Sequence, residues 1–122
     1  PARDTQPYHE VAKSEGLRLV AVTETHIHAD FLSGSRQLAH ETGATMSYRQ
    51  KGGEDWSYQF LGSKDRLLRD GDVIQIGNLS LEVLHTPGHA ANHLCLVLEE
   101  DGLLFSGDHI LNGSTTVPAG RL

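Results

Sequence analysis

Three short polar segments, each directly after an apolar run of strand length, constrain this chain more than any other feature. The first contains His26 and Asp30, the second runs from His85 to His89, and the third ends at Asp108. In open α/β sheets, ligands gather at the carboxyl ends of the strands, so the three segments are expected to converge. Histidine and carboxylate side chains are metal ligands. The sequence therefore predicts a sheet that carries a metal site along one edge.

Helices and strands are expected around these segments in a mixed order. The first helix is predicted over residues 6–15, with a cap at Asp4-Thr5, and the second runs from a cap at Ser33-Gly34-Ser35 to Gly43. The strands are predicted over residues 17–22, 44–49, 73–76, 79–84, 93–98 and 103–105, with a loop over 50–64. This order is typical of an α/β or α+β layered sheet rather than a helical bundle or a β-sandwich.

Length and charge narrow the class of protein further. The 122 residues fit one domain, and 10 basic against 16 acidic residues give a net charge of −6, which argues against a nucleic-acid or anionic-membrane partner. No apolar run approaches the roughly 20 residues of a membrane helix, and the first residues carry no apolar signal segment. The lone Cys95 cannot form an internal disulfide, so we expect a reducing, cytoplasmic setting. Cys95 lies between Leu94 and Leu96 in an apolar strand, so we expect it to be a core residue.

The positions of the 8 histidines indicate which of them bind metal. Residues two apart in an extended or tightly turned backbone point the same way, so His26 and His28 are expected to approach one ion, with Asp30 close by. A Pro-Gly turn then aims His89. A single HxH pair is a weak signal, whereas HxHxD followed by TPGH and by GD, each after a strand, is a specific one.

The remaining histidines receive two kinds of prediction. His9 and His40 lie on helix-like segments and are predicted to face solvent. Three others flank the proposed ligands in the sequence and are predicted to contact the metal ligands or the substrate: His85, His93 and His109.

The polar motifs resemble the metal-binding motifs of the metallo-β-lactamase fold superfamily, in the order and strand context of that family. The matching segments are Thr25-His26-Ile27-His28-Ala29-Asp30, Thr86-Pro87-Gly88-His89 and Ser106-Gly107-Asp108. The resemblance implies that His26, His28 and His89 hold a first metal ion. It also implies that Asp108 bridges or completes this site, and that Asp30 serves a second metal or the catalytic water.

Different parts of the chain are similar to different branches of the superfamily. Residues 24–38 and 70–89 resemble the persulfide dioxygenase branch, including its rhodanese-fused bacterial relatives, in which two histidines and one aspartate hold one iron. These ligands would be His26, His89 and Asp108. Phe31 stands where dinuclear members have a further histidine, which argues against a full second metal site. Residues 92–94 and 104–117 resemble hydrolase branches instead.

The resemblance also implies an architecture larger than this chain. The family's domain is a layered αβ/βα sandwich of two similar halves, and residues 1–122 are predicted to form a single partial domain with about half of it. Half a sandwich exposes one face of its sheet. A homo-oligomer is therefore expected to cover that face.

Three functions stay open at this point. The first is a zinc-dependent hydrolase, in which a metal-bound hydroxide attacks an ester, thioester, lactone or phosphoester of a small-molecule substrate, while Asp30 orients or deprotonates the water. The second is a persulfide dioxygenase with one Fe(II). The third is a truncated half-domain that binds metal without turnover and self-associates.

Overall fold

The computed structural model describes residues 1–26, 33–49 and 65–113. The helices are α1 (Gln6–Ser14) and α2 (Ser35–Thr42). The strands are β1 (Ala21–Thr23), β2 (Thr45–Tyr48), β3 (Arg66–Leu67), β4 (Val73–Ile76), β5 (Leu79–His85), β6 (Leu94–Leu98) and β7 (Leu103–Phe105), with a 3₁₀ turn at Glu99–Asp101. Neither described helix has the length and apolar character needed to cross a membrane. The mixed α/β architecture predicted from the sequence is confirmed.

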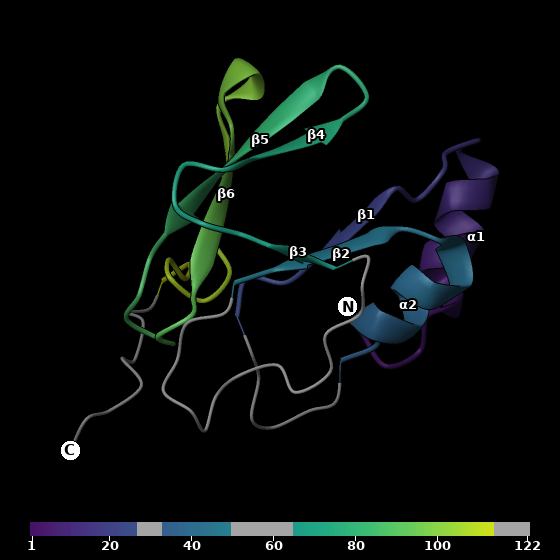
Figure 1. The fold of residues 1–122 in the computed structure, drawn as a ribbon, viewed down its shortest axis with the longest axis horizontal. Helices are drawn as coiled ribbons and strands as arrows, with labels where there is room; N and C mark the ends of the chain where they lie inside the picture. The colour runs from purple at the N-terminus through teal and green to yellow at the C-terminus, as the bar shows by residue number, and fades with distance from the viewer. Residues whose placement is uncertain (27–32, 50–64, 114–122) are drawn as a thin grey trace.

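The strands of the described part form two sheets of different kinds (Figure 1). β1, β2 and β3 pair in parallel, and α2 connects β1 to β2. The strands β4 to β7 pair with their sequence neighbours in antiparallel fashion. Antiparallel neighbours need only a tight turn, as at Gly77-Asn78 between β4 and β5, whereas parallel neighbours need a longer crossover.

The parallel sheet lies between the helices and the antiparallel sheet. Successive residues of a strand point to opposite faces of the sheet. Val22 of β1 therefore packs with Leu38 and Ala39 of α2, whereas the neighbouring Ala21 packs against the core of the antiparallel sheet around Val83. Figure 1 shows the two helices beside β1 and β2 and away from β6. Two apolar clusters, one on each face of β1, hold these layers together.

Three local features differ from the predictions. The strand expected at residues 17–22 begins only at Ala21. The short β3 has no counterpart among the predicted strands, because its two exposed residues carry no alternating pattern. Thr5 stands at the N-cap of α1, but its hydroxyl donates to Glu41 Oε2 at 2.9 Å instead of capping the helix. The other residue of the predicted cap, Asp4, does contact the first turn as expected, because its Oδ1 accepts a hydrogen bond from the Gln6 N–H at 3.1 Å.

β7 lies at the edge of the antiparallel sheet in the described part of the chain. Leu103, Leu104 and Phe105 are 49%, 47% and 51% exposed. Because consecutive residues point to opposite faces, both faces of this strand are incompletely covered by the residues that the structure describes.

Candidate metal centre

Three side chains from distant parts of the chain meet at one end of the two sheets. His26 Nε2 lies 3.2 Å from Asp108 Oδ2, and His89 Nε2 lies 3.3 Å from the same oxygen. One ligand atom from each of the three residues lies within 4.8 Å of the other two. The rings of His26 and His89 meet edge to face, with centroids 4.9 Å apart. One carboxylate oxygen thus faces two imidazole nitrogens.

Each of these residues follows the end of a strand. His26 comes after β1, His89 after β5 and Asp108 after β7. β1 belongs to the parallel sheet, and β5 and β7 belong to the antiparallel sheet. The two sheets are joined beside the site, where the Leu94 N–H donates to the Thr25 carbonyl at 2.7 Å. The sequence predicts this meeting of the three side chains, because ligands gather where the carboxyl ends of strands share an edge of a sheet.

The donor set and its spacing suit a metal ion. Ligand atoms at about 2.0–2.1 Å from an ion stand about 3.3 Å apart in a tetrahedral site and about 3.0 Å apart at right angles. The two nitrogen–oxygen distances of 3.2 and 3.3 Å agree with this spacing. Imidazole and carboxylate bind zinc and iron alike, so the three side chains fit a first-row divalent ion of either kind.

His26 forms the buried floor of the site. Its side chain is 3% exposed, against 33% for His89 and 39% for Asp108. Its Nδ1 lies 2.9 Å from Thr25 Oγ1, while its Nε2 faces Asp108. A hydrogen bond on the far nitrogen orients the ring of a metal-binding histidine. Thr25 thus contacts the far nitrogen of a candidate ligand, and the only sign of this in the sequence is its place directly before His26 in the first motif.

His93 packs beside the two candidate histidine ligands, His26 and His89. It is fully buried, and its ring stacks on His26 with centroids 4.9 Å apart and 22° between the planes. Burial lowers the pKa of His93 to about 4, with further lowering by the neighbouring His26, His109 and His89. The ring is therefore neutral near pH 7, so it places no positive charge beside a metal ion.

The other predicted site residues are placed less directly. His85 ends β5, and its Nε2 donates to the Ala91 carbonyl at 3.1 Å, within the loop that carries His89. The ring of His109 lies 5.8 Å from that of His93. His28, the predicted third histidine ligand, and Asp30, the predicted catalytic carboxylate, lie outside the described residues. Their roles stay predictions.

Gly107 is a second residue that the sequence argument passed over. Its φ is +52°, and a Cβ built on it would lie 2.6 Å from Thr25 Oγ1 and 2.8 Å from His93 Nε2. Glycine fits here because it adopts a left-handed conformation easily and has no Cβ. The signal was its place immediately before Asp108 in the third motif.

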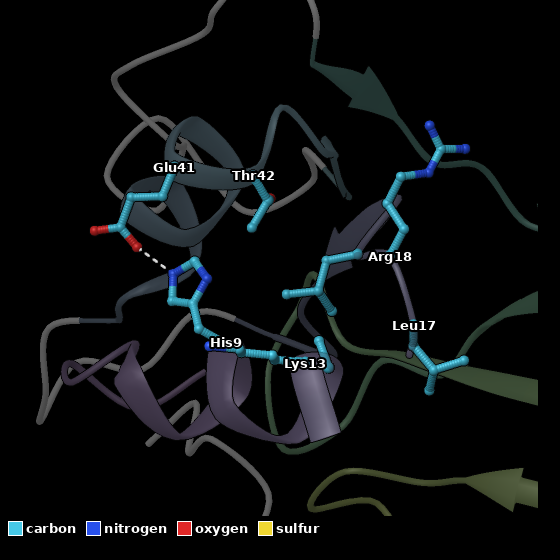
Figure 2. A pocket seen from close by; sticks show the side chains of 8 residues that line it. His9, Lys13, Leu17, Arg18, Glu41 and Thr42 are labelled. Atoms are coloured by element: carbon cyan, nitrogen blue, oxygen red, sulfur yellow. Dashed lines mark hydrogen bonds and ion pairs between the residues drawn. The ribbon is translucent and has the colours of Figure 1, made fainter. Parts of the chain in front are cut away.

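A second polar cluster lies in a surface hollow between α1, α2 and the segment before β1 (Figure 2). The hollow has a volume of about 350 Å³ and is lined by His9, Ala12, Lys13, Leu17, Arg18, Leu19, Glu41 and Thr42. Figure 2 shows the His9 ring directed at the Glu41 carboxylate, with His9 Nε2 and Glu41 Oε2 2.7 Å apart. The lining contains none of the candidate metal ligands.

Glu41 connects α1 to α2 by hydrogen bonds in this cluster. Besides its contact with His9, it accepts hydrogen bonds from the Thr5 hydroxyl at 2.9 Å and the Gln37 amide at 2.7 Å. These bonds, with His9 having the largest effect, lower the pKa of Glu41 to about 2. The prediction that His9 faces solvent is confirmed in part: its side chain is 34% exposed, but its ring also joins α1 to α2 through Glu41. His40 is exposed, as predicted.

The sequence matches known proteins over nearly its whole length. The model of the Metallo-beta-lactamase superfamily matches residues 5–120. The chain is 36% identical over 108 residues to an atrochrysone carboxyl ACP thioesterase of Aspergillus chevalieri, covering 88% of this chain and 33% of the relative. It is 33% identical over 110 residues to a hydroxyacylglutathione hydrolase of Methylobacterium nodulans, covering 90% and 40%. The chain thus spans well under half the length of these curated relatives.

Solved structures share the fold. A metallo-beta-lactamase from Staphylococcus aureus subsp. aureus COL has a TM-score of 0.86 and 36% identity, covering 98% of this chain and 38% of that protein. ETHE1 from Myxococcus xanthus has a TM-score of 0.77 and 25% identity, covering 97% and 51%. Both likenesses extend over almost all of this chain and over about half or less of the other protein.

Proposed function

The chain belongs to the metallo-beta-lactamase superfamily, and we propose that it forms the metal site of a hydrolase that acts on an ester, thioester, lactone or phosphoester. The observation that carries the proposal is the convergence of His26, His89 and Asp108. These three residues would hold the ion, with His28 as a further ligand. A metal ion, when bound, supplies Lewis acidity and lowers the pKa of a bound water to about 7.

The side chains of the site have separate tasks in this proposal. His26 presents Nε2 from the buried side, and its contact with Thr25 keeps the ring in place. His89 and Asp108 are each about one third exposed, so a substrate reaches the site from their side. Asp30 is proposed to orient the attacking water or to accept its proton.

A thioester has the most support among these substrates. The relatives named a thioesterase and a hydroxyacylglutathione hydrolase are 36% and 33% identical to this chain. The test is a panel of thioesters, lactones and phosphoesters offered to the zinc-loaded protein and to Asp108→Asn. We expect metal-dependent thioester hydrolysis that the variant lacks. Full metal content without turnover on the whole panel would contradict the proposal and favour a half-domain that only binds metal.

The three-residue group also favours a second candidate function. Two histidines and one carboxylate form the ligand triad of mononuclear Fe(II) oxygenases, which leaves positions open for oxygen and a substrate sulfur. The likeness to ETHE1 from Myxococcus xanthus supports this alternative, the persulfide dioxygenase. Oxygen uptake on glutathione persulfide, with one iron per chain, would overturn the hydrolase proposal. An iron-loaded protein that takes up no oxygen on glutathione persulfide would exclude the dioxygenase.

The partners of the chain stay predictions. We propose a small-molecule substrate and a homo-oligomer, with neither nucleic acid nor membrane as a partner, in a cytoplasmic setting. Light scattering over a range of protein concentrations tests the oligomer. A well-folded monomer at every concentration would contradict it.

A further inference from the structure

A partly buried chain of polar groups links the ends of the strands that carry the candidate ligands. His93 Nδ1 lies 2.9 Å from Thr86 Oγ1, which lies 3.3 Å from Cys95 Sγ. Cys95 Sγ in turn lies 3.7 Å from the Ser106 carbonyl oxygen. Thr86 follows β5, Cys95 lies within β6, and Ser106 follows β7. The chain of contacts therefore spans three neighbouring strands of the antiparallel sheet.

The chemistry of these groups gives the hydrogen bonds one direction. The Ser106 carbonyl can only accept, so the Cys95 thiol donates to it. The Thr86 hydroxyl then donates to Cys95 Sγ and accepts from His93 Nδ1–H. Within the described residues, His93 Nε2 is buried without a hydrogen-bond partner. A proton on Nδ1 leaves Nε2 as a bare lone pair, so no buried N–H of this ring is left unpaired.

The ring of His93 also touches the other two ligand segments. It stacks on His26, and a Cβ built on Gly107 would come within 2.8 Å of its Nε2. Its backbone carbonyl accepts a hydrogen bond from the Thr86 N–H at 3.0 Å. One fully buried side chain thus contacts the segments that precede or contain all three candidate ligands.

We propose that His93 is a positioning residue, which acts through Thr86 and Cys95 to hold the three ligand side chains at the spacing that a metal ion requires. The inference rests on the proposed function, since it assumes that those side chains bind an ion. Hydrogen-bonded neighbours that orient metal ligands change metal affinity by about 10- to 100-fold. His93 acts on the geometry of the site and is not itself a ligand.

Titration of the full chain with Co²⁺ tests this role, because Co²⁺ reports both affinity and coordination geometry through its visible absorption. Thr86→Val removes the hydroxyl at nearly constant shape, and Thr86→Ser keeps it. We expect Thr86→Val to bind Co²⁺ about 10- to 100-fold more weakly than the wild type, with an altered absorption band. Thr86→Ser should restore both properties.

A ring substitution tests the other end of the same chain of contacts. His93→Phe keeps an aromatic ring against His26 but removes Nδ1, and we expect a similar loss of Co²⁺ affinity. The double variant Thr86→Val/His93→Phe should bind Co²⁺ no more weakly than whichever single variant has the lower affinity. Both substitutions remove the same hydrogen bond, between Thr86 and His93, so their effects should not add. The exposed His40→Phe is the matched control and should bind Co²⁺ like the wild type.

The outcomes separate this inference from the proposed function. Unchanged Co²⁺ affinity and absorption in Thr86→Val and His93→Phe would overturn the inference alone. A wild type that binds no Co²⁺ would overturn both the inference and the proposed function. Failure of the proposed function has another signature, in which Co²⁺ binding depends on the Thr86 hydroxyl but no ester is hydrolysed. If circular dichroism shows that His93→Phe is unfolded, the two Thr86 variants decide.

Discussion

Two clusters in this protein combine histidine with a carboxylate but differ in the spacing of their atoms. They are the helical cluster of Thr5, His9, Gln37 and Glu41, and the metal-site cluster of His26, His89 and Asp108. In the helical cluster, Glu41 accepts hydrogen bonds from three side chains, with distances of 2.7 to 2.9 Å. In the metal-site cluster, Asp108 Oδ2 stands 3.2 and 3.3 Å from two imidazole nitrogens. Charge-assisted N–H···O bonds have lengths of about 2.7–2.9 Å. The first cluster has hydrogen-bond spacing, and the second has the spacing of metal ligands.

Exposure does not explain this difference. The Glu41 and Asp108 side chains are 33% and 39% exposed. The neighbours differ instead: Glu41 meets a hydroxyl, an amide and one ring, whereas Asp108 meets two rings. A neutral imidazole can direct a lone pair at a cation, which an amide N–H and a hydroxyl proton cannot do. Convergent lone-pair donors therefore indicate a metal site better than a short histidine–carboxylate contact does.

The largest expected effect is a loss of Zn²⁺ affinity on substitution of Asp108 but not of Glu41. Asp108→Ala removes a ligand, so Zn²⁺ affinity should fall by more than the roughly 100-fold that loss of a neighbour of a ligand can cost. Glu41→Gln should bind Zn²⁺ like the wild type. Competition with a chelating dye measures both affinities. Full metal content in Asp108→Ala would show that the site assignment is wrong.

The next effect concerns how tightly the metal-site cluster is packed. Gly107→Ala adds a methyl group against Thr25 and His93, whereas a Cβ at Gly102, which has a similar φ of +62°, meets nothing within 4 Å. Both substitutions incur left-handed strain of about 1–2 kcal/mol. Overpacking should add about 1–3 kcal/mol for Gly107→Ala alone. Urea unfolding measures the free energies, and equal losses in the two variants would contradict the packing described for His93.

The smallest effect is the acid dependence of the helical cluster. The pKa of Glu41 is about 2 in the folded protein against an ordinary 4.5. Its ionised form therefore stabilises the fold fully above about pH 4.5, and this contribution is lost as the pH falls toward 2. Because the side chain is exposed, the effect on Tm is small. The Tm difference between wild type and Glu41→Gln should shrink over this range, and a difference that stays constant down to pH 2 would refute the role of the carboxylate.

Local pattern accounts for the parts of the fold that the sequence predicts well. The strand–turn–strand of β4 and β5 follows from a mostly apolar run over 73–76, the turn at Gly77-Asn78 and the alternating side chains of 79–84, all of which are local signals. β3 depends on pairing with β2, and Arg66 and Leu67 carry no sign of that pairing. Such tertiary pairing is invisible to a pattern read along the chain.

In the candidate site, too, some features follow from local sequence and others depend on tertiary packing. The meeting of His26, His89 and Asp108 follows from the rule that strand ends share an edge of a sheet. The contact between His93 and Thr86 depends on the exact register of β5 against β6, which pairs His85 with Leu94. The bond between His9 and Glu41 depends on the angle between two helices. Sequence placed His93 near the ligand loop, but its stacking and its hydrogen bond come from three-dimensional packing.

The hydrogen bond from the Leu94 N–H to the Thr25 carbonyl joins the two sheets beside the site. A metal ion bound there would stabilise the same docking of the two sheets. His26 follows a strand of the parallel sheet, whereas His89 and Asp108 follow strands of the antiparallel sheet. An ion held by all three residues binds only while the sheets are docked. At a free concentration of 100 times its Kd, it would stabilise the docked state by about 2.7 kcal/mol. Metal occupancy and docking of the sheets are then linked equilibria, so a change that loosens the sheets also weakens metal binding.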